Sequence, residues 1–167
     1  DRDYRTLYSA QRALGGGIVL DAIHEIDYAL ELAGPAVEVE SWVSRSGVLE
    51  VDVEDVADIL ITHAGGASSH IHLDYLRRRR CRSCTVIGTN GELTWDVPRG
   101  VVEVITEPGQ EPVTLASAID ADANAQYVAE MQHVLAAAAS GGPTCNDIPR
   151  AAASVQVALE ALRRRGV

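Results

Sequence analysis

The chain has 167 residues, a length that suits one domain with its own hydrophobic core. Its formal net charge of −10 opposes non-specific binding to nucleic acid, whose phosphates are also negative. The sequence contains no apolar run approaching the roughly 18 residues of a membrane span. We therefore expect neither a nucleic-acid partner nor a membrane partner.

The first predicted elements are a polar leading segment of about 14 residues and a helix over 17–33, which Gly34-Pro35 ends. Alternation of apolar and polar residues predicts strands, and glycine pairs such as Gly65-Gly66 and the dipeptide Asn90-Gly91 predict the turns between them. The predicted strands cover residues 37–43, 52–64, 69–76, 85–87, 93–96, 101–105 and 113–115.

Helical periodicity returns in the last third of the chain. A helix is predicted over 122–139, with an apolar side formed by Val128, Met131, Leu135 and Ala138. Asn146 or Asp147 is expected to cap a final helix with Pro149 in its first turn and Arg163–Arg165 in its last. The core positions expected on that helix are Val155, Leu159 and Leu162.

This order of elements predicts the α+β class, with a mainly antiparallel, open-faced sheet and helices packed on one face. An apolar sheet face that no helix covers would have to be buried against another protein surface. The rows Val37/Val39/Val43 and Ile71/Leu73/Tyr75 provide apolar residues for such a face, so we expect a homo-oligomer through it.

The stretch from Gly15 to Tyr28 combines a glycine run with an acid and a histidine. On a helix, Asp21, His24, Glu25 and Tyr28 fall on one stripe. An imidazole titrates near neutral pH, and a carboxylate nearby can orient it, which is what proton transfer requires. The opposite face is apolar and consists of Ile18, Val19, Ala22, Ile26, Ala29, Leu30 and Ala33.

Further motifs accompany this stretch in a specific order and spacing. They occupy residues 1–10, 15–27, 54–60, 72–75, 87–96 and 127–133, followed by Gly141-Gly142-Pro143. Together they resemble the C-terminal, substrate-binding domain of the Gfo/Idh/MocA family of nicotinamide-dependent oxidoreductases. The resemblance covers nearly the whole chain.

The resemblance implies that residues 1–167 form a substrate-binding and dimerisation domain. NAD or NADP would then bind to an N-terminal Rossmann domain absent from this chain, and that domain would supply a catalytic lysine. This chain has no lysine, and its glycine run follows polar sequence rather than an apolar strand. Because the sequence starts at Asp1 rather than Met, we expect a piece of a longer protein, inactive and without bound cofactor on its own.

In the complete enzyme, as the resemblance implies, His24 would exchange a proton with a substrate hydroxyl and Asp21 would orient it. Many family members space the acid and the histidine four residues apart; here the spacing is three, so Asp27 is an alternative acid. The expected substrate is a sugar, sugar nucleotide or cyclic polyol. The candidate substrate-binding residues are Tyr4, Arg5, Tyr8, Arg12 and Tyr28.

Two other functions remain open. His70, His72 and Asp74 alternate on one strand, and His63 on the neighbouring strand could face them, which would suit a metal-binding module. Alternatively, the chain is a non-catalytic dimerisation domain.

The three cysteines are irregularly placed, which argues against a disulfide framework and favours the cytoplasm. We expect no zinc at Cys81 and Cys84, because a strand over 81–87 would point them to opposite faces.

Overall fold

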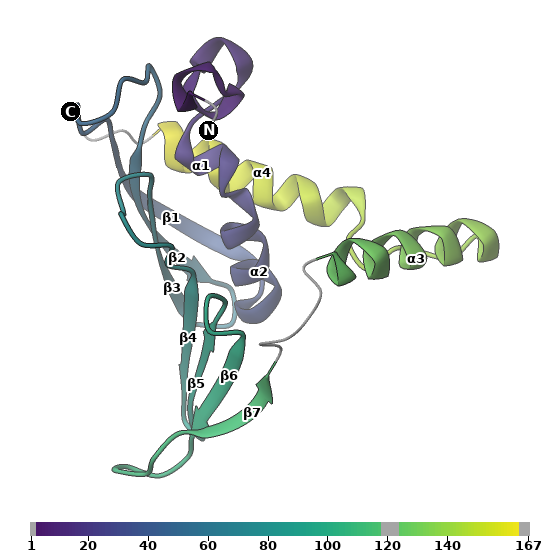
Figure 1. Cartoon of the computed structure of the whole chain (residues 1–167). Coiled ribbons are helices and arrows are strands. Elements are labelled where there is room, and N and C mark those ends of the chain that lie inside the picture. Colours follow the sequence, from purple (N-terminus) through teal and green to yellow (C-terminus); the bar gives the residue numbers. More distant parts are fainter. Residues whose placement is uncertain (1–2, 118–123, 164–167) are drawn as a thin grey trace. The chain divides into compact units, whose positions relative to one another are not determined.

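The computed structural model describes residues 3–117 and 124–163 (Figure 1). The chain divides into two compact units. The first unit contains residues 1–76 and 145–167, and the second unit contains residues 77–144. Both units combine antiparallel strands with helix, so the predicted α+β class is confirmed. The strands form two sheets, of three and four strands, instead of the single sheet that the sequence predicts.

The sheet of the first unit has the order β1-β2-β3 and is antiparallel throughout. Its strands are β1 (Ala36–Ser44), β2 (Val56–His63) and β3 (Ser68–Asp74). The predicted hairpin around Gly65-Gly66 joins β2 to β3. Side chains alternate between the two faces, and on β2 Ala57, Ile59 and Ile61 point into the core. Residues 52–55, predicted as strand, precede β2 as a loop.

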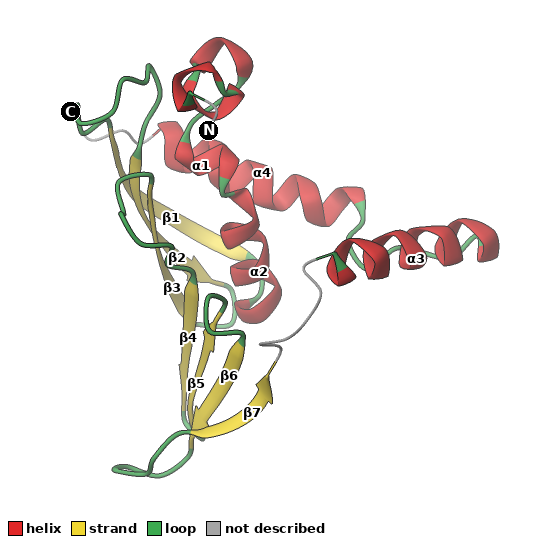
Figure 2. Cartoon of the chain, in the orientation of Figure 1, coloured by secondary structure: helices red, strands yellow, loops and turns green. Residues whose placement is uncertain are grey.

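Helices α1 (Ile18–Asp21), α2 (Ile23–Ala33) and α4 (Ile148–Arg163) cover one face of this sheet, as Figure 2 shows. Asp147 caps α4, because its Oδ1 accepts a hydrogen bond from the Arg150 backbone N–H at 3.0 Å. The core combines the inner face of the sheet with one side of each helix. Its buried members include Ile18, Val19, Ile26, Val39, Val43, Ile59, Ile61, Val157, Ala158 and Ala161.

The helix predicted over 17–33 is broken. Ala22 has φ −102° and ψ 27°, outside the helical region, and α2 starts anew at Ile23. The single stripe predicted for Asp21, His24, Glu25 and Tyr28 therefore does not hold. His24 is exposed whereas Glu25 is buried. The predicted apolar face is confirmed at Ile18, Val19, Ile26 and Ala29, which are all buried.

Two of the three core positions predicted on the last helix are wrong, because Val155 and Leu159 are each 43% exposed. The third, Leu162, is partly buried and packs against the core. The buried positions are Ser154, Val157, Ala158 and Ala161, of which three have small side chains. Small side chains let α4 lie close to β1 and α2, and the Ser41 hydroxyl donates to the Ala161 carbonyl at 2.7 Å.

The apolar rows expected on the open face belong to the covered face. Val39, Val43 and Leu73 are buried beneath the helices, and Ile71 and Tyr75 pack against the same core. Val37 leaves the row, because an irregularity between Ala36 and Glu38 shifts the strand register, and it is 65% exposed. The uncovered face instead carries Glu38, Glu40, Trp42, Asp58, Leu60, Thr62, His70 and His72.

The second unit contains a four-stranded antiparallel sheet in the order β4-β5-β6-β7. Its strands are β4 (Ser83–Gly88), β5 (Gly91–Asp96), β6 (Val101–Ile105) and β7 (Val113–Ser117). The predicted Asn90-Gly91 turn joins β4 and β5. The strand register places one apolar set on a single face: Cys84, Val86, Leu93, Trp95, Val102 and Val104. Cys81 precedes β4, so the strand argument against zinc does not apply to it.

Helix α3 (Ala125–Ser140) also belongs to the second unit. The start predicted for it, residues 122–123, lies outside the described residues, as do Arg164 and Arg165 of the last helix. The predicted apolar side of this helix is exposed: Val128 is 46%, Met131 57% and Leu135 62% accessible, and Ala138 is also exposed. Among the described residues, no helix is long and apolar enough to cross a membrane.

Candidate active site around His24

His24 lies in the first turn of α2, immediately after the break at Ala22. Its ring is about half exposed, and Nε2 lies 3.0 Å from Glu25 Oε1. At this distance the ring, when protonated, forms an ion pair with the carboxylate. His24 therefore combines a solvent-accessible imidazole with a fixed acidic neighbour, the combination needed for moving a proton.

Glu25 is the buried half of this pair, with a side chain that is only 11% exposed. Its second oxygen, Oε2, accepts a hydrogen bond from the Tyr28 hydroxyl at 2.5 Å. Glu25 also lies in the first turn of α2, where the positive end of the helix dipole favours a carboxylate. Tyr28 is thus connected to His24 through Glu25.

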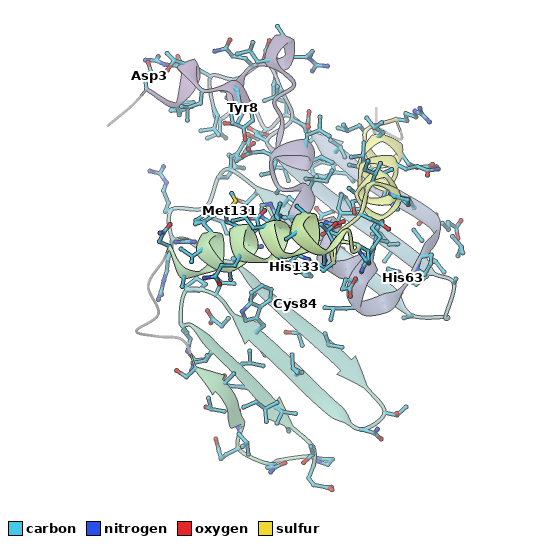
Figure 3. All side chains as sticks on the ribbon, turned by 90° about the vertical axis from the view of Figure 1, so that its right-hand side faces the viewer. Asp3, Tyr8, His63, Cys84, Met131 and His133 are labelled. Atoms are coloured by element: carbon cyan, nitrogen blue, oxygen red, sulfur yellow. The ribbon has the colours of Figure 1, made fainter. Side chains whose placement is uncertain are left out.

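Asp21 has different partners from those predicted. Its Oδ1 accepts a hydrogen bond from the Tyr8 hydroxyl, and its Oδ2 accepts one from the Tyr75 hydroxyl at 3.0 Å. Figure 3 labels Tyr8, which comes from the N-terminal 3₁₀ turns. Both oxygens of Asp21 are engaged with tyrosines, whereas the ring of His24 faces Glu25.

Two tyrosines are held as hydrogen-bond donors by this arrangement. Burial raises the pKa of the Tyr75 hydroxyl far above its usual range, and the negative charge of Asp21 adds to the shift. The hydrogen bond to Asp21 also raises the pKa of Tyr8, which is exposed. Sequence reasoning missed Tyr75 because it lies 54 residues beyond Asp21, at the end of β3.

Glu54 lies against the glycine run. It is 6% exposed, its carbonyl accepts from the Ile18 N–H at 3.1 Å, and its carboxylate covers Gly17. A Cβ at Gly17 would lie 2.0 Å from Glu54 Oε1, and Gly17 has φ +120°, so this position requires glycine. A carboxylate here opposes a pyrophosphate. That this glycine run is no dinucleotide motif stays a prediction.

The other candidate substrate-binding residues contact the loop over 50–52. Arg5 binds Asp3 and Glu50, and the Glu50 N–H donates to the Tyr4 hydroxyl oxygen at 3.2 Å. The Arg12 guanidinium donates to the Asp52 carbonyl at 3.0 and 3.2 Å. Of the five candidates, the structure connects Tyr8 to Asp21 and Tyr28 to His24 through Glu25. Substrate contact stays a prediction for all five.

Asp27, the alternative acid, also has other partners. Its Oδ1 accepts from the Ser154 hydroxyl at 2.7 Å, and its Oδ2 accepts from the Asn146 side-chain amide at 3.4 Å. These bonds connect α2 to α4 and to Asn146, which precedes α4 in the chain. Asp27 and Tyr28 line one side of a groove of about 1260 Å³ between α2, β1 and α4.

The metal-binding alternative is not supported. His63 points into the core on the side opposite His70 and His72, where its ring nitrogens contact the Gly34 carbonyl at 2.6 Å and the Ser69 hydroxyl at 2.8 Å. Asp58 Oδ1 lies 3.1 Å from His70 Nε2 and 2.9 Å from His72 Nδ1. Within residues 3–117 and 124–163, no group of three histidine, cysteine or acidic side chains could hold a metal ion.

Comparison with known proteins identifies the class of this fold. The sequence profile of the GFO/IDH/MocA C-terminal domain matches residues 2–94, which is more than half of the chain. The chain therefore belongs to the Gfo/Idh/MocA family, and residues 2–94 match its C-terminal domain. The predicted resemblance is confirmed. A comparison with curated proteins gave no match.

Solved structures share the fold at low sequence identity. One is UDP-N-acetylglucosamine 3-dehydrogenase GnnA from Acidithiobacillus ferrooxidans (TM-score 0.76, 19% identity, 89% of this chain and 47% of that one). Another is aldose-aldose oxidoreductase from Caulobacter crescentus, complexed with glycerol (0.82, 20%, 98% and 50%). A third is levoglucosan dehydrogenase in complex with NADH (0.80, 20%, 99% and 54%). This chain spans about half the length of each of these proteins.

Proposed function

We propose that this chain is the substrate-binding half of a nicotinamide-dependent oxidoreductase that acts on a sugar, sugar nucleotide or cyclic polyol. The observation that carries the proposal is the exposed imidazole of His24 at the start of α2, paired with the buried carboxylate of Glu25. The similar structures support the substrate class, because their names refer to UDP-N-acetylglucosamine, aldose and levoglucosan.

Oxidation of an alcohol breaks a C–H bond and an O–H bond and forms a carbonyl. A nicotinamide cofactor, when bound, accepts the hydride from carbon. His24 takes the hydroxyl proton and passes it to water. We propose that a separate N-terminal domain holds NAD or NADP and supplies a lysine. The Glu54 carboxylate lies against Gly17 of the glycine run, where it would repel a pyrophosphate, and the chain has no lysine.

The test compares this chain with a longer protein that carries it behind a dinucleotide-binding domain. Each is assayed for reduction of NAD⁺ and NADP⁺ with UDP-N-acetylglucosamine, levoglucosan, glucose and myo-inositol. We expect turnover with at least one of these in the longer protein and none in the 167-residue chain. Absence of turnover with all of them would favour the alternative of a non-catalytic dimerisation domain.

We also propose that the uncovered face of the β1-β2-β3 sheet binds a second copy of the chain. This face exposes Trp42 and Leu60 between charged groups, with Glu40 opposite Leu60 and His70 beyond it. Carboxylates and histidines on one surface can pair across a two-fold axis. Light scattering should give a dimer mass that Trp42→Glu reduces to that of a monomer, whereas Leu32→Glu, on the exposed side of α2, should leave the dimer intact. A monomer in the unmodified chain would contradict the proposal.

A further inference from the structure

We propose that His72 makes the dimer proposed above depend on pH. When its ring carries two N–H groups, it bridges Asp58 and Asp74, and the uncovered sheet face then binds a second copy of the chain more tightly. This inference rests on the proposed dimer, because it assigns the regulation of that same face. The arrangement that carries it is one histidine ring between two carboxylates.

The first step of the argument is the geometry of the ring. His72 Nδ1 lies 2.9 Å from Asp58 Oδ1, and Nε2 lies 3.2 Å from Asp74 Oδ2, both with hydrogen-bond geometry. Asp74 is itself fixed, because its side chain is only 8% exposed and its Oδ1 accepts from the Leu76 backbone N–H at 2.9 Å. The structure therefore places an acceptor at each nitrogen of the ring.

The second step is the chemistry of imidazole. A neutral ring has one N–H donor and one lone pair, whereas an imidazolium has two donors. An ionised carboxylate only accepts, so a neutral His72 can donate to Asp58 or to Asp74 but not to both. Its other nitrogen then turns a lone pair toward a carboxylate. Both bonds exist together only after the ring takes a second proton, which histidine does near neutral pH while aspartates stay ionised.

The third step concerns the charge of the uncovered face. It carries the carboxylates of Glu38, Glu40, Asp58 and Asp74, and the imidazoles of His70 and His72. With neutral histidines, two copies of this face bring like charges together, which opposes association. A proton on His72 removes one negative charge from each copy. His70 Nε2 lies 3.1 Å from the same Asp58 oxygen and adds to this effect when protonated.

The fourth step is the position of the bridge beside the exposed tryptophan of this face. In the strand register Trp42 lies opposite Asp58, which lies opposite His72. Trp42 is 52% exposed, and a second copy that covers it also covers the adjacent Asp58 carboxylate. Removing a carboxylate from water is costly unless an opposite charge pairs with it. Protonated His72 supplies that charge, so the burial of Trp42 is favoured at low pH.

The groups that act on His72 are separate from the candidate active site. Titratable groups face it from its own strand, where they are His70 and Asp74, and from β2, where Asp58 lies. Helices α1 and α2 contact β3 from the covered side of the sheet. The titratable groups of these helices are Asp21, His24, Glu25, Asp27, Tyr28 and Glu31. A response through His72 therefore belongs to the uncovered face.

The closing experiment measures the dimer Kd of the 167-residue chain by sedimentation equilibrium in EDTA. The two conditions are about pH 5.5 and about pH 8.5, below and above the usual histidine range. We expect Kd to be about 10-fold lower at the acidic pH, the size expected from one partly exposed ion pair in each copy. His72→Gln, which cannot take the proton, should remove most of this difference. His24→Gln, at an exposed histidine of α2, is the matched control and should keep it.

Asp58→Asn distinguishes a charge effect from a structural one. Removing the carboxylate should lower Kd at the alkaline pH toward its acidic value, whereas simple damage to the face would raise Kd at both. Circular dichroism verifies that each variant is folded. Equal Kd values at the two pH values, a pH difference that persists in His72→Gln, or dimers that form only when zinc replaces EDTA would overturn the inference. A monomer at both pH values would refute the proposed dimer and this inference with it.

Discussion

The two units of this protein combine the same kinds of element with different degrees of burial. In the first unit, α1, α2 and α4 cover a sheet whose inner residues Ile59 and Ile61 are fully buried. In the second unit, Val101 is the one buried apolar residue among those described. In both units, strands that alternate apolar and polar residues form a sheet. Only in the first unit do helices pack on the sheet and bury a core.

The candidate site lies in the well-packed unit. His24, Glu25 and Asp21 belong to helices that pack on the sheet, so their positions are fixed by the same contacts that form the core. A proton-transfer group must be held within a fraction of an ångström of its working geometry, and a packed element holds it better than an exposed one. The following predictions test this difference between the units.

The largest expected effect is a cavity in the core of the first unit. Ile59→Ala should lower the free energy of unfolding by about 2–5 kcal/mol, because Ile59 is fully buried. The matched change in the second unit, Ile87→Ala, should alter it by less than about 0.5 kcal/mol, because Ile87 is 80% exposed. Urea denaturation measures both.

The two tryptophans make the same comparison sharper, since Trp42 lies in the first unit and Trp95 in the second. In a Trp95→Phe background, Ile59→Ala should shift the urea midpoint followed by Trp42 fluorescence. In a Trp42→Phe background, the midpoint followed by Trp95 should move much less. Equal shifts would show that the units unfold together.

A smaller effect is expected from the buried hydroxyl that connects α4 to α2. Ser154 is 4% exposed and donates to Asp27 at 2.7 Å, so Ser154→Ala leaves a carboxylate oxygen without that donor. We expect a loss of about 1–3 kcal/mol in the free energy of unfolding. Ser140→Ala, at the exposed end of α3, is the matched control and should be close to neutral. A loss as large as that of Ser154→Ala would contradict the comparison.

The raised pKa of Tyr75 predicts that the free energy of unfolding depends on pH, and removing the Tyr75 hydroxyl should change that free energy less than Ser154→Ala does. Burial and Asp21 raise its pKa in the folded state, so the unfolded tyrosine loses its proton first as pH rises. The stabilisation is therefore fully present below about pH 10, the usual tyrosine pKa, and decreases above it. Tyr75→Phe should lower stability by about 0.5–1.5 kcal/mol at neutral pH and flatten the decrease above pH 10. Tyr8→Phe, at an exposed tyrosine with the same partner, should flatten it less.

The smallest effect is expected at an exposed ion pair of the second unit. Arg99 binds Glu103 with two bonds of 3.0 and 3.1 Å, which raise the pKa of the Arg99 guanidinium. Solvent and salt screen such a pair, so Arg99→Ala should change stability less than Tyr75→Phe does. Thermal unfolding at low and high salt checks this, and an effect that grows with salt would contradict it.

Local signals predicted much of the fold. The strand pairs and their turns follow from alternation and from Gly65-Gly66 and Asn90-Gly91, and Asp147 with Pro149 marks the start of α4. The face of α4 could not be found in this way. Periodicity favoured Val155 and Leu159, whereas the helix buries Ser154, Val157, Ala158 and Ala161.

The sequence singles out the residues of the candidate site but not the contacts between them, and their roles stay predictions. His24, Asp21 and Tyr28 were identified from the glycine-rich motif, and Tyr8 from its position before it. The break at Ala22 and the bond from Tyr75 depend on contacts between distant parts of the chain, which a helical wheel does not contain. Glu25 was placed on the stripe opposite the apolar face for the same reason, although it is buried beside His24.

The most direct test of the proton-transfer role is the pH profile of turnover for His24→Ala in the longer protein, with saturating cofactor. We expect kcat to fall by about 10²- to 10⁴-fold, the usual contribution of a positioned base, and the pH dependence of the remaining activity to change. His70→Ala, which removes another exposed histidine, from β3, is the control and should retain normal turnover. Near-normal turnover of His24→Ala with an unchanged pH profile would contradict the role assigned to His24.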